Sequence, residues 1–343
     1  MTGQEAPPAP APGRRTVVVG LGPSDESVVT RVLGDAYEFV ATPTAADLAV
    51  ASAAIVRADI ALDAAALGQM PELKVLARTG VGTDLIDLEA ATSRGIPVVI
   101  TPGSGTRAVA EGVIAHALHL AKRLTPMTTL VRDDRWRDRT LSGPLGDLDG
   151  ATIGIIGYGR IGRRVGELAS AFGMRVLAHD PFAAPEPQVN CPDLNQLAGE
   201  SDYLSLHVPL TPQNVHLVDE QFIARMRPGA ILINCGRGAL VDLDAALAGL
   251  RSGRLAGLGL DVFDPEPPEH HPIFDHPHVC LTPHLMGMTR RAGEATFRDA
   301  ARGITDVLTG RTPPAVANPG WESCAPSRPQ NTHTKEQQPC ESA

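Results

Sequence analysis

Short apolar runs alternate with amphipathic stretches along most of the chain from residue 14 onward. Early runs with the length and β-branched content of buried strands lie at 16–19, 37–41, 74–77 and 97–100. Later runs of the same kind lie at 152–156, 174–178, 203–208, 230–234, 258–262 and 279–282. Because helical stretches separate these runs, the pattern predicts an α/β protein whose parallel sheets are doubly wound, with helices on both faces.

Two helices are predicted where the chain passes between two such sheets. Residues 106–124 carry Val109, Val113 and Ala117 at helical spacing, with Thr106 as the expected cap. A last helix, about residues 289–308, follows the final strand. We therefore predict a discontinuous first domain, residues 14–104 and 288–318, into which a second domain, residues 105–287, is inserted. Chemistry is expected in the cleft between them, and residues 1–13 and 319–343, which are rich in proline, are expected to be disordered tails.

Composition narrows the classes of function. The 343 residues are 43% hydrophobic and carry a formal net charge of −9, with acidic and basic residues mixed along the chain. The sequence contains no basic tract for nucleic acid and no apolar run that could span a bilayer, so neither partner is expected. The five cysteines form no C-x-x-C pair, and no secretion signal is apparent. A cytoplasmic protein is therefore expected.

The strongest motif lies at residues 151–162, where an apolar run is followed by Gly157, Gly159 and Gly162 in the pattern G-x-G-x-x-G. Between a strand and a helix, such glycines allow a tight turn, close approach of a pyrophosphate and close helix–strand packing. Asp180 ends the next strand, where a carboxylate can accept from a ribose 2′-hydroxyl and would repel a 2′-phosphate. The second domain is therefore predicted to be a Rossmann domain that binds NAD rather than NADP.

Three late strands end in side chains that could perform chemistry. Arg237, Glu266 and His284 follow the runs at 230–234, 258–262 and 279–282. An arginine can bind a carboxylate through two hydrogen bonds, and a histidine can exchange a hydroxyl proton. A neighbouring glutamate would stabilise the protonated histidine and orient it. Since the carboxyl ends of strands in such sheets face the ligand, the three residues are predicted to form one catalytic site.

With these motifs the chain resembles the D-isomer-specific 2-hydroxyacid dehydrogenase family, and within it the D-3-phosphoglycerate dehydrogenases. The resemblance covers roughly residues 70–318 and rests on segments 78–84, 95–98, 101–103, 110–111, 207–212, 235–238, 261–267 and 282–287, besides the glycine motif. It implies a flavodoxin-like first domain and assigns catalysis to Arg237, Glu266 and His284. It also implies NAD contacts from Arg160, Ile161, Asp180, Val208, Cys235, Gly236 and Asp261.

The same resemblance implies that Val81 and Gly82 hold the substrate carboxylate, and that Arg78 meets an anionic substrate group. Arg137 and Arg139 are either further anion contacts or solvated charges, and a homodimer is expected. Two departures from the family stand out. Residues 104–106 read Ser-Gly-Thr where an asparagine is frequent, and the regulatory domains of long phosphoglycerate dehydrogenases are not expected.

Several alternatives remain open at this point. The substrate is expected to be a small D-2-hydroxy acid like phosphoglycerate, but a phosphonate-bearing or glyoxylate-type 2-oxo acid is also compatible. A different class of function is an NAD-sensing binding protein similar to the corepressors of this family. No metal is expected, although residues 269–278 are rich in histidine, because prolines interrupt their spacing. His116 and His119 share a helix face and are interpreted as histidines at the edge of the core.

Overall fold

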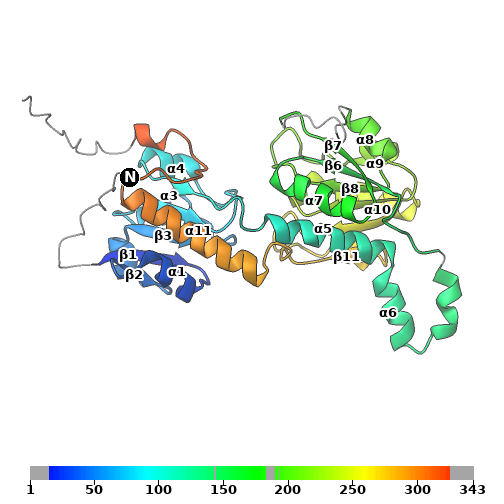
Figure 1. Ribbon diagram of the computed structural model, residues 1–343, viewed down its shortest axis with the longest axis horizontal. Coiled ribbons are helices and arrows are strands. Elements are labelled where there is room, and N and C mark those ends of the chain that lie inside the picture. The colour runs from blue at the N-terminus through cyan, green and yellow to red at the C-terminus, as the bar shows by residue number, and fades with distance from the viewer. Residues whose placement is uncertain (1–14, 143, 183–188, 190, 192, 325–343) are drawn as a thin grey trace, which may run out of the picture. The chain divides into compact units, whose positions relative to one another are not determined.

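The computed structural model describes residues 15–142, 144–182, 189, 191 and 193–324. The chain forms two compact units. The first unit comprises Met1–Pro102 and Glu294–Ala343, and the second unit comprises Gly103–Gly293. Each unit is built on its own parallel sheet (Figure 1). The α/β fold with two doubly wound sheets is thereby confirmed.

The first unit has a five-stranded sheet in the order β2-β1-β3-β4-β5, and every pairing is parallel. This is the flavodoxin-like order, in which the chain starts in the middle and reverses once. The strands are β1 (Thr16–Leu21), β2 (Tyr37–Val40), β3 (Ala53–Val56), β4 (Val75–Arg78) and β5 (Val98–Val99). Between them lie α1 (Glu26–Leu33), α2 (Ala45–Val50), α3 (Ala64–Gly68) and α4 (Leu88–Ser93).

Helices cover both faces of the first sheet. On one face, Val29 of α1 packs with Phe297 and Ile304 of α11 (Arg290–Leu308), the long C-terminal helix. On the other face, Leu67 of α3 and Ala91 of α4 close a second apolar core. Because the strands are buried on both sides, they read as continuous apolar runs rather than alternating ones.

The second unit has a six-stranded parallel sheet in the order β11-β10-β9-β8-β6-β7. Its strands are β6 (Thr152–Ile156), β7 (Arg175–His179), β8 (Tyr203–Leu206), β9 (Ala230–Asn234), β10 (Leu255–Leu260) and β11 (Val279–Leu281). One face is covered by α5 (Thr106–Ala121) and α7 (Arg160–Ala171), and the other by α8 (Leu194–Glu200), α9 (Glu220–Arg225) and α10 (Leu243–Arg251). The order reverses between β6 and β8, which is where ligands bind in such sheets.

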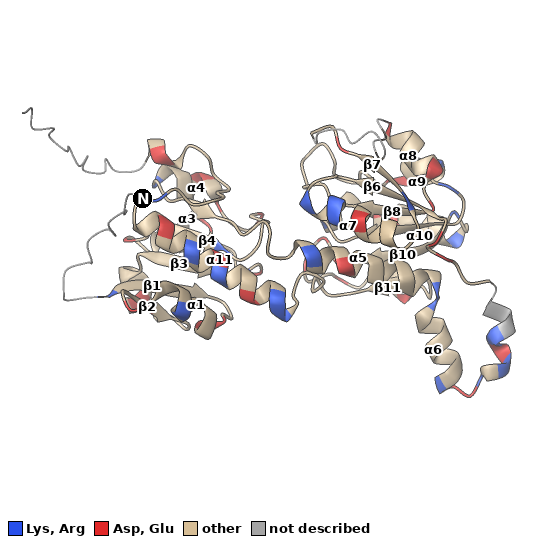
Figure 2. Ribbon diagram, in the orientation of Figure 1, with Lys and Arg blue, Asp and Glu red and all other residues tan. Residues whose placement is uncertain are grey.

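A short helical segment leaves α5 before the glycine motif begins. It consists of α6 (Leu124–Arg132) and the 3-10 helix η1 (Trp136–Ser142). Figure 2 shows basic and acidic residues interspersed on its distal part. Further 3-10 helices are η2 (Gly238–Leu240), η3 (Pro272–Asp275) and η4 (Trp321–Ser323). All helices that the structure describes are too short or too polar to cross a membrane.

The structure corrects three expectations. Strand β3 was not anticipated, because its run Ala-Ala-Ile-Val follows an alanine-rich helix and has no periodicity of its own. Thr106 does not cap α5; Gly105 precedes the helix and makes no side-chain cap. Residues 321–323, assigned to the C-terminal tail, form η4, and the Trp321 side chain is buried. The described part of the predicted C-terminal tail is residues 319–324, whereas residues 1–13 and 325–343 lie outside the described residues.

Candidate functional site

The glycine loop after β6 uses its three glycines differently. Gly157 has φ +93°, and a Cβ there would lie 2.7 Å from the carbonyl carbon of His207. A Cβ on Gly162 would run into the Gly157 carbonyl oxygen. Gly159 instead is exposed, has φ −78°, and a Cβ there would meet no atom within 4 Å. The fold itself therefore requires Gly157 and Gly162, whereas the absence of a side chain at Gly159 leaves room for a ligand.

The surroundings of this loop fit a dinucleotide. Gly159 is the N-cap of α7 and has no capping side chain, so the helix offers N–H groups and a positive dipole end to a phosphate. Asp180 follows β7, and its Oδ2 accepts from the N–H of Tyr158 at 2.8 Å, while Oδ1 accepts from that of Phe182 at 2.9 Å. The carboxylate is thus held beside the loop, and its oxygens retain lone pairs for ribose hydroxyls.

The other predicted NAD contacts also lie at the carboxyl edge of this sheet. Arg160 and Ile161 begin α7, Val208 follows β8, Cys235 and Gly236 follow β9, and Asp261 follows β10. Asn234, for which no role was predicted, shapes the turn after β9. Its Oδ1 accepts from the Gly236 N–H at 3.0 Å, and its Nδ2 donates to the Arg237 carbonyl at 2.8 Å. The signal available in the sequence was an asparagine at the end of an apolar run; the structure shows that this side chain is fully buried.

The buried thiol of Cys235 lies at the same edge. Burial raises its pKa far above the usual range, and the charge of Asp261 adds to the effect. The thiol is therefore protonated at neutral pH and is not a nucleophile.

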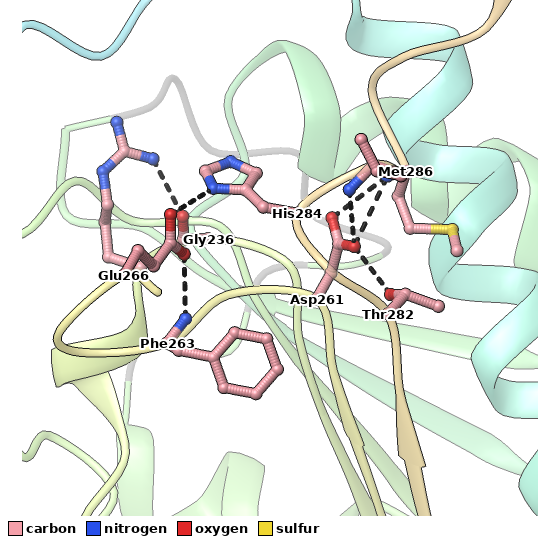
Figure 3. Close-up of polar contacts among 9 residues, drawn as sticks. Gly236, Asp261, Phe263, Glu266, Thr282, His284 and Met286 are labelled. Atoms are coloured by element: carbon pink, nitrogen blue, oxygen red, sulfur yellow. Dashed lines mark hydrogen bonds and ion pairs between the residues drawn. The ribbon is translucent and has the colours of Figure 1, made fainter. Parts of the chain in front are cut away.

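The structure brings His284 and Glu266 together. His284 Nδ1 lies 2.8 Å from Glu266 Oε2, and Glu266 Oε1 accepts from the Phe263 N–H at 2.9 Å (Figure 3). A carboxylate can only accept, so the proton of a neutral His284 lies on Nδ1, and Nε2 is left as the basic nitrogen. The side chains of His284 and Glu266 are 49% and 38% exposed, so a ligand from solvent can reach them.

The backbone of His284 is unusual because φ is +54°, in the left-handed region that non-glycine residues seldom adopt. Such a conformation costs roughly 1–3 kcal/mol and persists only where the surroundings enforce it. The residue therefore depends on tertiary contacts for its orientation.

Arg237 lies on the neighbouring turn. Its Nη1 donates to the Gly236 carbonyl at 2.8 Å. A Cβ on Gly238 would overlap the backbone of Phe263 and Asp264, so the turn after β9 packs directly against the turn that carries Glu266. Figure 3 shows Gly236, Glu266 and His284 on the same side of the view. The structure thus gathers the three predicted residues from the ends of β9, β10 and β11.

Asp261, which is 2% exposed, joins the end of β10 to the segment that contains His284. Its Oδ1 accepts from the Thr282 hydroxyl at 2.6 Å and from the Leu285 N–H at 3.0 Å, and its Oδ2 accepts from the Met286 N–H at 3.2 Å (Figure 3). Burial raises the pKa of Asp261, and these hydrogen bonds oppose that change. The roles of Thr282 and these backbone donors were not predicted.

The first unit holds the residues predicted to meet the substrate carboxylate. Within the part of the chain that the structure describes, the N–H groups of Val81 and Gly82 donate no hydrogen bond. The adjoining Gly80 is fixed by Thr101, whose Oγ1 accepts from its N–H at 2.8 Å. Arg78 is buried, and its Nη1 donates to the Thr79 carbonyl at 2.5 Å. The loop after β4 therefore leaves two backbone N–H groups available to an acceptor.

Other candidate residues lie elsewhere. Arg137 and Arg139 are on η1, and the Arg139 guanidinium stacks over Trp136 at 5.0 Å from the ring centroid. In the histidine-rich stretch, His270 and His271 pair separately with Asp275 and Asp244, each at 3.3 Å. Among the described residues, no group of three histidine, cysteine, aspartate or glutamate side chains could hold a metal ion.

Residues 114–286 match the family described as D-isomer specific 2-hydroxyacid dehydrogenase, NAD binding domain. D-3-phosphoglycerate dehydrogenase of Mycobacterium leprae is 36% identical over 272 residues, which are 78% of this chain but 51% of that enzyme. The chain thus spans about half the length of that relative. Glyoxylate reductase of Thermococcus litoralis is 38% identical over 266 residues, 75% of this chain and 80% of the reductase.

Among solved structures, D-lactate dehydrogenase of Aquifex aeolicus complexed with NAD and lactic acid superposes with a TM-score of 0.74. It is 29% identical, and the match covers 86% of this chain and 96% of that one.

Proposed function

The chain belongs to the D-isomer specific 2-hydroxyacid dehydrogenase family, and from this premise we propose that it transfers a hydride between C2 of a D-2-hydroxy acid and NAD. The observation that carries the proposal is the His284–Glu266 pair, at 2.8 Å, at the carboxyl edge of the NAD-binding sheet. A histidine with Nδ1 held by a carboxylate and an accessible Nε2 is arranged to exchange a proton.

We assign the residues of the second unit as follows. In the oxidation direction, His284 Nε2 takes the proton of the C2 hydroxyl as the carbon–oxygen double bond forms. The Glu266 carboxylate stabilises the resulting imidazolium, and the Phe263 N–H keeps that carboxylate in place. The Arg237 guanidinium binds the substrate carboxylate through parallel N–H donors. The glycine loop and Asp180 would hold NAD, which would supply the acceptor for the hydride that leaves C2.

We propose that the predicted first domain, residues 14–104 and 288–318, adds substrate contacts to that of Arg237, and that residues 105–287 bind the cofactor. The N–H groups of Val81 and Gly82 bind the substrate carboxylate, since unpaired amides in a glycine loop favour anions. Arg78 supplies positive charge next to this loop, which suits an acid with an anionic tail such as phosphoglycerate.

A second candidate is the reduction of a glyoxylate-type 2-oxo acid. It is favoured by the similarity to a glyoxylate reductase, of which the chain covers 80% rather than about half. The residues and the proton transfer are the same, and the substrate differs only in lacking the anionic tail. A phosphonate-bearing acid would resemble the phosphorylated substrate.

The test is a set of initial rates followed by NADH absorbance. D-3-phosphoglycerate, D-glycerate and D-lactate are compared in oxidation, and glyoxylate and hydroxypyruvate in reduction, for the wild type and His284→Ala. We expect the variant to lose turnover on every acid and to keep its affinity for NADH. A preference for phosphoglycerate supports the first candidate, and activity on glyoxylate without it supports the second. Tight NADH binding without turnover on any acid would instead indicate a corepressor-like NAD sensor.

We also infer a homodimer that forms through α6 and η1. Val131 and Trp136 there are 58% and 60% exposed, and an apolar patch formed by such side chains would mark a surface for contact with a partner. Light scattering of the wild type and Val131→Asp tests this: the wild type should be a dimer and the variant should dissociate. A monomeric wild type would reject it.

A further inference from the structure

A chain of hydrogen bonds runs from the middle of α5 to the segment that follows His284. His116 Nε2 lies 3.1 Å from Thr282 Oγ1, and the Thr282 hydroxyl donates to Asp261 Oδ1 at 2.6 Å. Asp261 in turn accepts from the backbone N–H groups of Leu285 and Met286. All members belong to the second unit, and His116 is 2% exposed. The chain therefore connects a buried helix side chain to both flanks of His284.

The number of protons on each side chain determines which group donates in each hydrogen bond. A threonine hydroxyl has a single proton, and Thr282 donates it to the Asp261 carboxylate, which has none to give. His116 must therefore donate from Nε2, which leaves Nδ1 as a bare acceptor. His116 Nδ1 is buried without a hydrogen-bond partner among the described residues. Burial lowers the pKa of His116 to about 4, and the charge of His119 adds to this, so the ring is neutral at pH 7 and carries its one proton on Nε2.

The surroundings of His116 are shaped for this ring. Gly259 of β10 lies beneath it, and a Cβ there would be 2.8 Å from His116 Nδ1. One turn earlier on α5, a Cβ on Gly112 would be 2.6 Å from Met286 Sδ. Figure 3 shows Met286 directed toward the translucent ribbon of this helix. Gly112 and His116, four residues apart, form one face of α5 on which residues 282–286 lie.

We propose that His116 is a positioning residue, which acts through Thr282 and Asp261 to hold residues 282–286 and thereby keeps His284 in its left-handed conformation facing Glu266. The kinetic part of this inference rests on the proposed function. His284 has no glycine-like freedom at φ +54°, so its neighbours must enforce the conformation. The Thr282 side chain precedes His284 by two residues and the two N–H groups follow it directly, so Asp261 clamps the segment on both sides.

The experiment compares two pairs of variants with a matched control. His116→Leu and Thr282→Val break the chain, whereas His116→Gln and Thr282→Ser keep a donor and a hydroxyl. His119→Leu makes the same change three residues later on α5, at an imidazole whose Nε2 lies 2.9 Å from Thr125 Oγ1 and that is not part of the hydrogen-bond chain to Asp261. Hydrogen–deuterium exchange of the Leu285 and Met286 amides, kcat, KM and NADH affinity are measured for each, with thermal melts of the unliganded proteins.

We expect His116→Leu and Thr282→Val to raise amide exchange at residues 285 and 286 by tenfold or more and to lower kcat by about tenfold, as loss of one buried hydrogen bond would. KM should change less than kcat, because the carboxylate contacts are elsewhere. His116→Gln and Thr282→Ser should have amide exchange and kcat close to those of the wild type. His119→Leu should match the wild type in both.

Unchanged exchange in both breaking variants would overturn the proposal, as would equal losses in His116→Leu and His116→Gln, which would indicate packing alone. If the wild type oxidises no 2-hydroxy acid, the proposed function fails. Amide exchange would then still decide whether His116 holds the segment. If His116→Leu does not fold, Thr282→Val, which only exchanges a hydroxyl for a methyl group, carries the test.

Discussion

The sharpest prediction concerns Gly159, because the structure separates its role from those of its neighbours. A Cβ at Gly159 meets no atom within 4 Å, and its φ of −78° lies outside the left-handed region that favours glycine. Alanine there gains roughly 0.4–1 kcal/mol from a less flexible unfolded chain and loses a similar amount as a poorer N-cap. Gly159→Ala should therefore unfold within about 1 kcal/mol of the wild type when no ligand is present.

The same methyl group would occupy the space above the N-terminus of α7, where the pyrophosphate is expected to approach the backbone. We predict that the affinity for NADH falls by tenfold or more, roughly 1.4 kcal/mol. At an NADH concentration near 100 times the wild-type Kd, bound ligand stabilises the wild type by about 2.7 kcal/mol, and a tenfold weaker Kd halves this to about 1.4 kcal/mol. The upward shift in Tm on adding NADH should halve accordingly.

Gly162→Ala is the contrasting variant, since its Cβ would meet the Gly157 carbonyl and would lie 3.1 Å from Ile155 Cγ2. It should lose roughly 1–3 kcal/mol of stability without any ligand, as overpacked sites do. Fluorescence titration with NADH and thermal melts, with and without NADH, measure both effects. Wild-type NADH affinity in Gly159→Ala would refute the placement of the pyrophosphate. If Gly159→Ala without ligand had a Tm as low as that of Gly162→Ala, the absence of a side chain at residue 159 would be required by the fold and not only by the ligand.

The charge of Glu266, the carboxylate of Asp180 and the buried histidines can each be tested separately. Glu266→Gln keeps an acceptor for His284 Nδ1 but removes the negative charge. Because both side chains are partly exposed, kcat should fall by only about tenfold, and the affinity for NADH should not change. An unaltered kcat would show that the charge of Glu266 does not contribute to catalysis. Asp180→Asn should raise kcat/KM for NADPH relative to kcat/KM for NADH by about tenfold, because a 2′-phosphate is no longer repelled. An unchanged ratio would show that the ribose does not bind beside Asp180. Burial lowers the pKa of both His116 and His207 from 6.5 to about 4. The unfolded chain therefore binds protons first as the pH falls, and stability that is complete above pH 6.5 should drop by a few kcal/mol toward pH 4. Urea unfolding at several pH values measures this loss, which should be smaller in His116→Leu; an equal loss would contradict the assignment.

Local sequence was sufficient to predict the fold class and the edge of the sheet at which the candidate catalytic residues lie. Strands β6 and β9 begin and end at the predicted residues, because apolar runs bounded by glycine or polar residues are unambiguous in parallel sheets. Since parallel strands end at one edge, the positions of Arg237, Glu266 and His284 in the chain already implied that they lie near one another.

Tertiary structure alone decided how these residues are held. Thr282 follows His116 by 166 residues, and no periodicity links them; on its own helix, His116 was interpreted only as a histidine at the edge of the core. Likewise, the spacing of the glycine motif does not reveal which glycine is crowded by backbone and which faces open space. Hydrophobic periodicity reports which face of an element is buried. It does not report which polar group of a distant segment contacts a side chain on that face, because this partner is determined by the packing of the whole unit.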